Sequence, residues 1–392
     1  MKRNLTALIF AMCVVFFSSP IFSQDSENCE PSPLTTSDLL NAKRINRLLK
    51  DKQFAAIDDE LNDKKRRYEK KEYSDLVLYE DVSNAVKNEA SLEPLLAQWV
   101  AETPKSMFAR LLKAKNHISV GFSKRGLEVA DKTSVEQLSA MESELKKAFE
   151  ELNIAQALDP NSALSAAALI EIARAVAGVA SVREILLNAE KKDPENLVAR
   201  YYAINALSPR WGGSFEDLDA ILARSGKTSL DIKKVRLLQY QVEMEKAHHF
   251  EIITKEKTKA IVLYRSAAQI CSFITPWSGV ARAAYEIEDW KSLKEATTQV
   301  ISGYPKHLGS FQKRAWANEK LGLMSEAVND YQVAADLGDA WAINKLGYLY
   351  MIGNGVAKDL QRAKLLLTSA VAKGNANAQA NLDSINRQLG GQ

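Results

Sequence analysis

The sequence is poor in the residues that build catalytic and metal centres. It contains three cysteines and four histidines in 392 residues, and no spacing among them matches a zinc site. Cys13 lies in the N-terminal apolar stretch, so Cys29 and Cys271 are left for the remainder of the chain. Two cysteines permit one disulfide in an oxidising compartment and exclude a small fold stapled by several disulfides.

Whether Cys29 and Cys271 pair is left open by the sequence. Cys29 falls within residues 24–36, whose polar and proline-containing composition predicts a flexible lead-in. A disulfide is therefore permitted but not favoured. A nucleophilic role for Cys271 is disfavoured, because residues 272–275 supply neither a base nor a cation beside it. We interpret Cys271 as a buried structural thiol.

Motifs of phosphate binding and nucleophilic catalysis are also missing. There is no GxSxG elbow and no Walker loop, and Gly353-Asn354-Gly355 lacks the third glycine and the preceding strand of a dinucleotide-binding fingerprint. His248 and His249 are adjacent, so on a helix their side chains point about 100° apart, and we interpret them as exposed polar residues. We expect no catalytic residue, no cofactor and no metal.

A long uncharged apolar run is absent beyond the first 23 residues. Lys2 and Arg3 precede an apolar stretch over 5–17 that is shorter than the roughly 20 residues of a membrane span. A Ser-Ser-Pro break follows it. This pattern predicts a signal peptide over residues 1–23, cleaved before Gln24, with a retained anchor as the alternative. We expect a periplasmic or secreted protein with no membrane span after signal removal.

Charge of one sign is not in excess. The formal net charge of the full chain is +3, and removing residues 1–23 removes two basic residues and no acid, which leaves +1. A nearly neutral chain has no bulk electrostatic attraction to nucleic acid or to a membrane surface, so we expect no nucleic-acid partner. The basic run at 64–67 is followed by Glu69 and Glu72, which favours a solvated helix face.

What the sequence has in abundance is the period of amphipathic helices. From Ser37-Asp38 onward, apolar residues recur at helical spacing nearly throughout. Pro94 suits the first turn of one such helix, and Thr103-Pro104 ends it. Alternating β-branched runs are few, and turns are spaced for helices of about 10 to 20 residues. The predicted fold class is all-α.

An internal repeat supports this prediction. Asp159-Pro160 recurs as Asp193-Pro194 after 34 residues, which is the period of the tetratricopeptide repeat, a unit of two antiparallel helices. Proline suits the turn between units because it tolerates the first turn of a helix but not the interior. Small residues between the two turns favour close helix contact: Ala166, Ala167, Ala168, Ala173 and Ala177.

A second repeat, with a period of 36 residues, closes the chain, because Ala334 and Gly338 recur as Ala370 and Gly374. The residues around it follow one pattern: Ala342, Leu346, Gly347, Tyr350, Gly353, Gly355, Asp359, Ala363, Ala370 and Gly374. This pattern closely resembles the Sel-one-like repeat, a relative of the tetratricopeptide repeat. The resemblance implies a right-handed α-solenoid of stacked antiparallel helix pairs, and repeats of both classes commonly bind proteins.

The residues of this C-terminal pattern have physical roles that predict local structure. Helices are expected over about 340–351 and 359–373. Gly353 and Gly355 permit unusual backbone angles in the loop, and Asp359 can cap the second helix. Gly374 ends that helix. Residues 376–389 are expected to form a polar-faced terminal cap helix, which solenoids require.

The middle of the chain has one non-repeat feature, the sequence from Ser208 to Ser214 that contains Trp-Gly-Gly-Ser. With its surroundings over about 40–225, it resembles an uncharacterised bacterial helical domain family, which implies a helical fold and no assigned activity. Arg210 and Trp211 are candidate partner-binding residues, since these types dominate interface energetics. The alternative, which we favour, is that Trp211 fills a gap between helix pairs while the glycines make the turn.

These observations predict an organisation and a function. After the lead-in, we expect a divergent helical-repeat domain over 37–225, helical hairpins over 226–310, and tetratricopeptide- and Sel-one-like repeats over 311–392. The predicted function is an exported scaffold or adaptor that binds a protein or peptide partner on a helical-repeat surface. The alternative is an envelope-associated enzyme, or an accessory subunit of one, with a site in the divergent N-terminal half.

Overall fold

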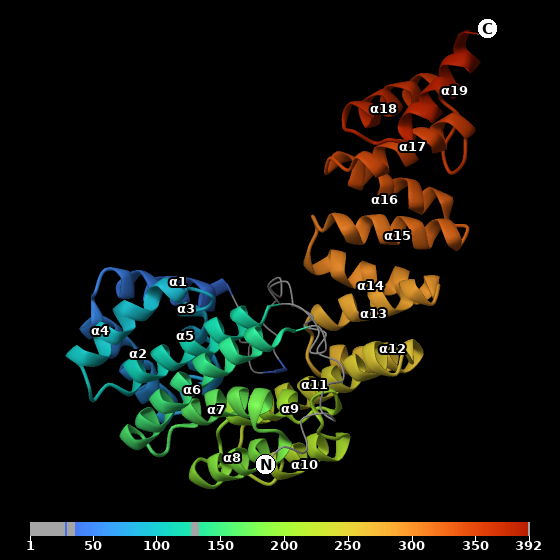
Figure 1. The fold of residues 1–392 in the computed structure, drawn as a ribbon. Helices are drawn as coiled ribbons and strands as arrows, with labels where there is room; N and C mark the ends of the chain where they lie inside the picture. Colours follow the sequence, from blue (N-terminus) through green and yellow to red (C-terminus); the bar gives the residue numbers. More distant parts are fainter. Residues whose placement is uncertain (1–27, 30–35, 127–132, 391–392) are drawn as a thin grey trace. The chain divides into compact units, whose positions relative to one another are not determined.

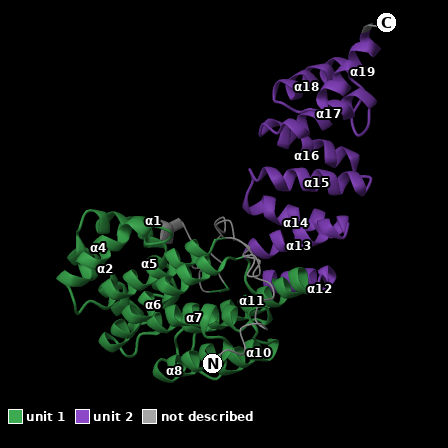
Figure 2. Cartoon of the chain, viewed as in Figure 1, with its two compact units in different colours: residues 1–254, 269–272 green, residues 255–268, 273–392 purple. Residues whose placement is uncertain are grey.

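A computed structural model describes residues 28–29, 36–126 and 133–390 (Figure 1). The predicted signal peptide and most of the predicted lead-in lie outside these residues. Every element in the described ranges is helical, which confirms the all-α prediction, while the right-handed sense of the solenoid stays a prediction. The chain forms two compact units, residues 1–254 with 269–272 and residues 255–268 with 273–392 (Figure 2). The finer division at residues 225 and 310 also stays a prediction.

Unit 1 holds the helices of the N-terminal part. They are α1 Thr36–Lys50, α2 Phe54–Glu69, α3 Asp75–Ala85, η1 Ala90–Leu92, α4 Glu93–Glu102, α5 Met107–Arg125, α6 Val135–Leu158, α7 Ala163–Val176, α8 Val179–Lys192, α9 Val198–Ala206, η3 Pro209–Trp211, α10 Phe215–Ser225, α11 Ile232–His248 and the π-helix η4 His249–Ile253. Side-chain caps fix several of their starts. Ser134 with Gln137 and Ser214 with Asp217 form capping boxes at α6 and α10.

The 34-residue repeat is present as predicted. The first Asp-Pro turn separates α6 from α7, and the second separates α8 from α9. Helix α7 is buried over most of its length, including Ala166, Ala167 and Ala168. It packs against α6, α8 and α9. Small side chains let these neighbours approach closely, so α7 occupies the centre of unit 1.

Unit 2 is a succession of helix pairs in chain order (Figure 1). Its helices are α12 Lys257–Ile270, α13 Thr275–Glu286, α14 Trp290–Gly303, α15 Leu308–Lys320, α16 Met324–Asp336, α17 Ala340–Ile352, α18 Leu360–Ala372 and α19 Ala378–Gly390. The last three confirm the helices predicted for the Sel-one-like pattern and its cap, with ends that differ by one or two residues.

The loop between α17 and α18 has the geometry that its glycines predict. Gly353 and Gly355 have φ of +74° and +76°, in the left-handed region that favours glycine. The Asp359 carboxylate accepts a hydrogen bond of 2.8 Å from the Arg362 N–H and caps α18. A Cβ on Gly347 would lie 2.9 Å from Leu367, which explains why a residue without a side chain stands where α17 meets α18.

The predictions for Lys64 and Cys29 are wrong because tertiary packing decides which side chains are exposed, and Cys271 is buried as predicted but belongs to a disulfide and is not a thiol. Lys64 was expected on a solvated face, but it is 9% exposed. It lies one turn after the buried Leu61 and pairs with Asp81 at 2.7 Å. Cys29 was expected in a free lead-in, yet it is 1% exposed and forms a disulfide with Cys271, with 5.7 Å between their Cα atoms.

Candidate functional site

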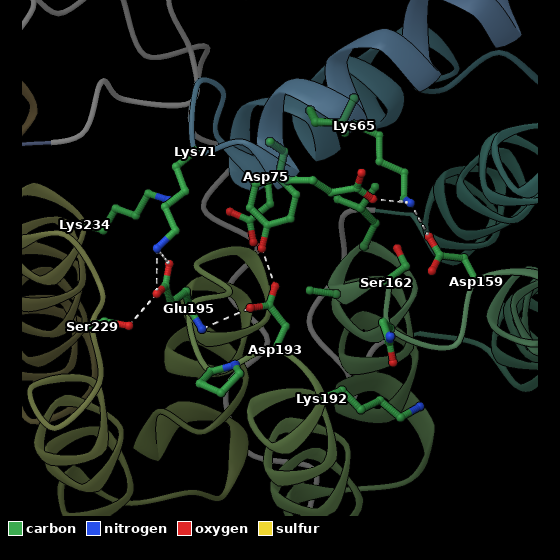
Figure 3. A pocket seen from close by; sticks show the side chains of 17 residues that line it. Lys65, Lys71, Asp75, Asp159, Ser162, Lys192, Asp193, Glu195, Ser229 and Lys234 are labelled. Carbon is green, nitrogen blue, oxygen red and sulfur yellow. Dashed lines mark hydrogen bonds and ion pairs between the residues drawn. The ribbon is translucent and has the colours of Figure 1, made fainter.

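A cavity of about 510 Å³ lies in unit 1, where the ends of several helices meet (Figure 3). The end of α2, the start of α3, the start of α7, the turn from α8 to α9 and the start of α11 all contribute residues to its wall. Both Asp-Pro turns of the 34-residue repeat border this cavity, through Asp159 and Asp193. The stacking of the helix pairs therefore brings equivalent turns to one place.

The cavity wall is rich in both signs of charge. Its cations are Lys65, Lys71, Lys192 and Lys234, and its carboxylates are Glu69, Asp75, Asp159, Asp193 and Glu195. Several of them form ion pairs. Lys65 lies 2.7 Å from Glu69 on the same helix and 3.1 Å from Asp159, and Lys71 lies 2.9 Å from Glu195. The pairs with Asp159 and Glu195 link α2 and the residues just after it to the turns that precede α7 and α9.

Asp75 is the buried anchor of this wall, with 1% of its surface exposed. Its Oδ2 accepts hydrogen bonds from the N–H groups of Leu197 at 2.9 Å and Val198 at 3.1 Å. Asp75 thus caps the start of α9 from a residue more than 120 positions earlier in the chain. Burial raises the pKa of Asp75 to about 6, despite these backbone donors.

The remaining polar groups form a second line of contacts. The Tyr68 hydroxyl donates to Asp193, and burial raises the pKa of Tyr68, so the hydroxyl stays protonated. Asp193 also accepts from the Glu195 N–H at 3.0 Å. Hydrogen bonding from the Ser229 hydroxyl, followed by Lys71, lowers the pKa of Glu195. The wall therefore offers fixed carboxylate acceptors beside lysine donors.

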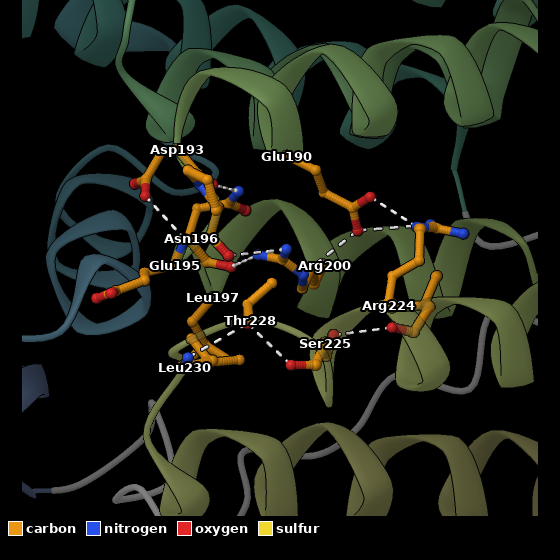
Figure 4. Close-up of polar contacts among 12 residues, drawn as sticks. Glu190, Asp193, Glu195, Asn196, Leu197, Arg200, Arg224, Ser225, Thr228 and Leu230 are labelled. Carbon is orange, nitrogen blue, oxygen red and sulfur yellow. Dashed lines mark hydrogen bonds and ion pairs between the residues drawn. The ribbon is translucent and has the colours of Figure 1, made fainter.

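A buried arginine fixes the turn that carries Asp193 and Glu195 (Figure 4). Arg200 is 1% exposed, donates to the carbonyl oxygens of Asn196 and Pro194, and lies 3.3 Å from Glu190. Glu190 also pairs with Arg224 at 2.7 Å. Because a buried guanidinium needs all of these partners, the turn has little freedom to move.

The side chains that line this cavity are suited to binding a polar ligand. Its wall carries lysines, carboxylates, hydroxyls and a tyrosine, and neither histidine nor cysteine is among its lining residues. Within the described ranges, no group of three histidine, cysteine, aspartate or glutamate side chains could hold a metal ion. Alternating donors and acceptors of both charges suit a ligand that itself carries both, such as the main chain and side chains of a peptide.

The pKa of Asp75 predicts a pH dependence of stability. Because its folded-state value is about 6 against an ordinary value of 3.8, the folded protein holds this proton more tightly than the unfolded chain. The resulting stabilisation is present below pH of about 4 and is lost as the pH rises through about 6. We expect Asp75→Asn to remove this decline, as measured by urea unfolding between pH 4 and 7. The exposed cap variant Asp231→Asn should keep the wild-type slope, and an unchanged slope in Asp75→Asn would contradict the assignment.

Arg210 and Trp211, the sequence candidates for partner binding, lie away from this cavity. Arg210 pairs at 2.9 Å with Glu245, which is 3% exposed. The guanidinium of Arg174 lies 4.6 Å from the centre of the Trp211 ring. A Cβ on Gly213 would lie 1.9 Å from the Leu207 carbonyl oxygen, so the second glycine is required by the turn. This geometry supports the structural interpretation, and a role in partner binding stays a prediction.

The histidines are less exposed than the sequence suggested. His248 and His249 are half-buried where α11 passes into the π-helix, and the His249 ring lies 5.2 Å from the Phe215 ring. The prediction of exposed histidines is therefore wrong, because α10 covers this end of α11. His117, which no motif singled out, is buried and bonds to Glu144 at 2.7 Å.

Comparison with known proteins finds similarity to solved helical-repeat structures. No protein-family model and no curated protein matches the chain. A Sel1 repeat protein from Oxalobacter formigenes is 17% identical, with 53% of this chain and 89% of that chain covered and a TM-score of 0.28. The protective antigen c5321 of uropathogenic Escherichia coli, which displays an SLR fold, is 15% identical over 87% of this chain and 82% of that one, with a TM-score of 0.30.

A human IFIT1 dimer with PPP-AAAA is 14% identical over 79% of this chain and 72% of that one, with a TM-score of 0.35. Similarities at this level carry no argument about fold or function. The fold follows from the helices of the chain itself. The described residues form an all-α helical-repeat protein, whose last three helices lie where the Sel-one-like sequence pattern predicted them. None of the helices in the described ranges has the length and apolarity to cross a bilayer.

The sequence did not predict most of the cavity residues, but it did contain the repeated Asp-Pro turns that border the cavity. Asp159 and Asp193 belong to the repeated Asp-Pro turns, and a repeat places equivalent turns side by side. Lys65, Tyr68 and Asp75 come from a different part of the chain, and no motif connects them with those turns. Their position depends on how α3 packs against α7 and α9, and on how α2 packs against α3.

Proposed function

We propose that this protein is an exported scaffold that binds a protein or peptide partner, with the charged cavity of unit 1 as one contact point. The observation that carries the proposal is the convergence of repeated turns on a cavity whose lysines and carboxylates alternate. Such a surface recognises a chain with its own donors and acceptors, and stacked helix pairs provide a long surface around it.

Two observations support export. The sequence predicts a signal peptide over residues 1–23, and Cys29 pairs with Cys271 in the structure. Structural disulfides persist in oxidising compartments, including the bacterial periplasm, and are rare in the cytosol. A periplasmic or secreted location therefore fits both the N-terminal segment and the cysteine chemistry.

Affinity capture from periplasmic extract tests the function. We expect the protein recovered there to begin at Gln24 and to retain a stoichiometric protein partner after cross-linking. Lys234→Gln removes a cation of the cavity wall that lies near the Tyr68 ring. We expect it to weaken binding of the captured partner by about tenfold, the effect of losing one charged contact.

The matched control is Lys233→Gln, because Lys233 is the exposed neighbour and does not line the cavity. It should bind the partner as the wild type does. Equal affinity of both variants would remove the cavity from the proposal. Turnover by the isolated protein that is lost in Lys234→Gln, with no partner recovered, would favour the alternative of an enzyme.

A further inference from the structure

Three alternate helices of unit 2 repeat a cation followed three residues later by an aromatic side chain. The pairs are Arg282 and Tyr285 on α13, Lys313 and Trp316 on α15, and Lys345 and Tyr348 on α17. Residues three apart lie on one side of a helix. The members of successive pairs are 31 and 32 residues apart, so stacking places equivalent side chains on the same side of the stack.

The aromatic members of these pairs are not core residues. Tyr285, Trp316 and Tyr348 are 37%, 36% and 37% exposed. The Tyr285 and Trp316 rings lie 5.4 Å apart at an angle of 80°. Trp290 stacks on Trp316 at 6.5 Å and 14°. Tyr285 and Trp316 therefore form an exposed aromatic corner, with the partly buried Trp290 stacked behind Trp316.

The cations of this face differ in whether they form ion pairs. Lys345 pairs with Glu319 at 2.8 Å, which also ties α17 to α15. Glu286 pairs with Lys257 at 2.6 Å. Lys313 is exposed and makes no ion pair with any residue that the structure describes. Partial shielding of the Lys313 ammonium from water by neighbouring atoms, and then the charge of Arg282, lower the pKa of Lys313.

We propose that this face of unit 2 binds an extended acidic segment of the partner protein, with a carboxylate against Lys313 and aromatic or proline side chains on Tyr285 and Trp316. The inference rests on the proposed function, in which the partner is a protein. The cation–aromatic pairs lie on alternate helices, each of which contacts α14 or α16, and the Tyr285 and Trp316 rings lie 5.4 Å apart. Because an extended chain advances about 3.3 Å per residue, ring-bearing side chains about two residues apart in the segment match these two rings.

The charge balance favours a protein segment over single-stranded nucleic acid. Nucleic-acid grooves track a phosphate at every nucleotide with an excess of cations. Here Glu286 and Glu319 lie on the same helices, and Glu319 already occupies Lys345. A ligand with a few carboxylates and several ring-bearing side chains contacts both the cations and the aromatic side chains of the face. A polyanion would instead be repelled by Glu286 and Glu319.

Peptide selection with matched variants tests the inference. A displayed library of random 12-residue peptides is selected on the full mature protein, and the affinity of the most enriched peptide is measured by fluorescence anisotropy. We expect enrichment of acidic residues together with aromatic residues or proline. Lys313→Glu and Trp316→Ala should each weaken binding of that peptide at least about tenfold.

The control is Lys364→Glu, which makes the same charge change at an exposed position of α18 outside this face, and it should leave the affinity unchanged. Thermal unfolding of each variant checks that unit 2 remains folded. Peptides without acidic enrichment, or peptides that bind Lys313→Glu and Trp316→Ala as tightly as the wild type, would overturn the inference. Tighter binding of a 12-nucleotide oligothymidine that displaces the peptide would overturn it as well.

The outcome separates this inference from the proposed function. A captured partner whose affinity falls in Lys234→Gln but not in Lys313→Glu or Trp316→Ala supports the scaffold and rejects this face. Acidic peptides that depend on Lys313 and Trp316, in the absence of any captured partner, support the face and reject the scaffold in its proposed form.

Discussion

Replacing both Cys29 and Cys271 by serine should lower the free energy of unfolding of unit 1 by about 2–5 kcal/mol. The two residues are 242 positions apart and join in a disulfide, so the cross-link restricts a long stretch of the unfolded chain. Both cysteines are at most 1% exposed, and the serine pair leaves two hydroxyls in a buried position. Urea unfolding followed by far-ultraviolet circular dichroism measures the difference.

Reduction provides the control for this prediction. Dithiothreitol should lower the stability of the wild type toward that of the serine variant and should leave the serine variant unchanged. Intact-mass analysis after alkylation under denaturing, non-reducing conditions should find no free thiol at Cys29 or Cys271. Free thiols at these positions, or equal stability of the wild type and the serine variant, would show that the disulfide does not stabilise unit 1.

Replacing Gly355 by valine should loosen the end of unit 2 and leave unit 1 intact. Gly355 has φ of +76°, and a Cβ there would lie 2.7 Å from the Met324 carbonyl oxygen. The backbone strain alone costs about 1–3 kcal/mol, and the close contact with α16 adds to it. Because repeat units contact only their neighbours, hydrogen exchange should accelerate over residues 340–390 and stay unchanged before residue 225.

Gly374→Val is the matched control, because Gly374 has φ of +82° but no atom lies within 4 Å of its added Cβ. It isolates the backbone strain from the close contact, so its effect on exchange should be smaller. Unchanged protection over residues 340–390 in Gly355→Val would show that this glycine is not geometrically required. Equal loss of protection in both units would show one cooperative structure and would contradict the modular description.

Gly355 and Cys271 belong to different compact units (Figure 2), so we expect a change at one of them to affect mainly its own unit. The two predictions therefore probe different parts of the chain. Loss of the disulfide acts on unit 1, and strain at the glycine loop acts on unit 2. Exchange measured by segment in both sets of variants separates the two responses.

The sequence by itself determined the helices, their turns and the repeat. Helical period, the Asp-Pro turns at 159 and 193, and the positive φ required at Gly353 and Gly355 are short-range properties, because neighbouring residues along the chain set them. For this reason α17 and α18 lie where the pattern predicted them. Arg210 and Trp211 stood out for the same reason, as an unusual local sequence.

Only the tertiary structure decided which residues meet. The Cys29–Cys271 disulfide, the cap that Asp75 gives to α9 and the burial of Lys64 depend on contacts between distant segments. The sequence contains each residue but not the distance between them, because the stacking of helix pairs sets that distance. The cavity of unit 1 and the cation–aromatic rows of unit 2 arise in this way, where repeated helices bring equivalent positions together.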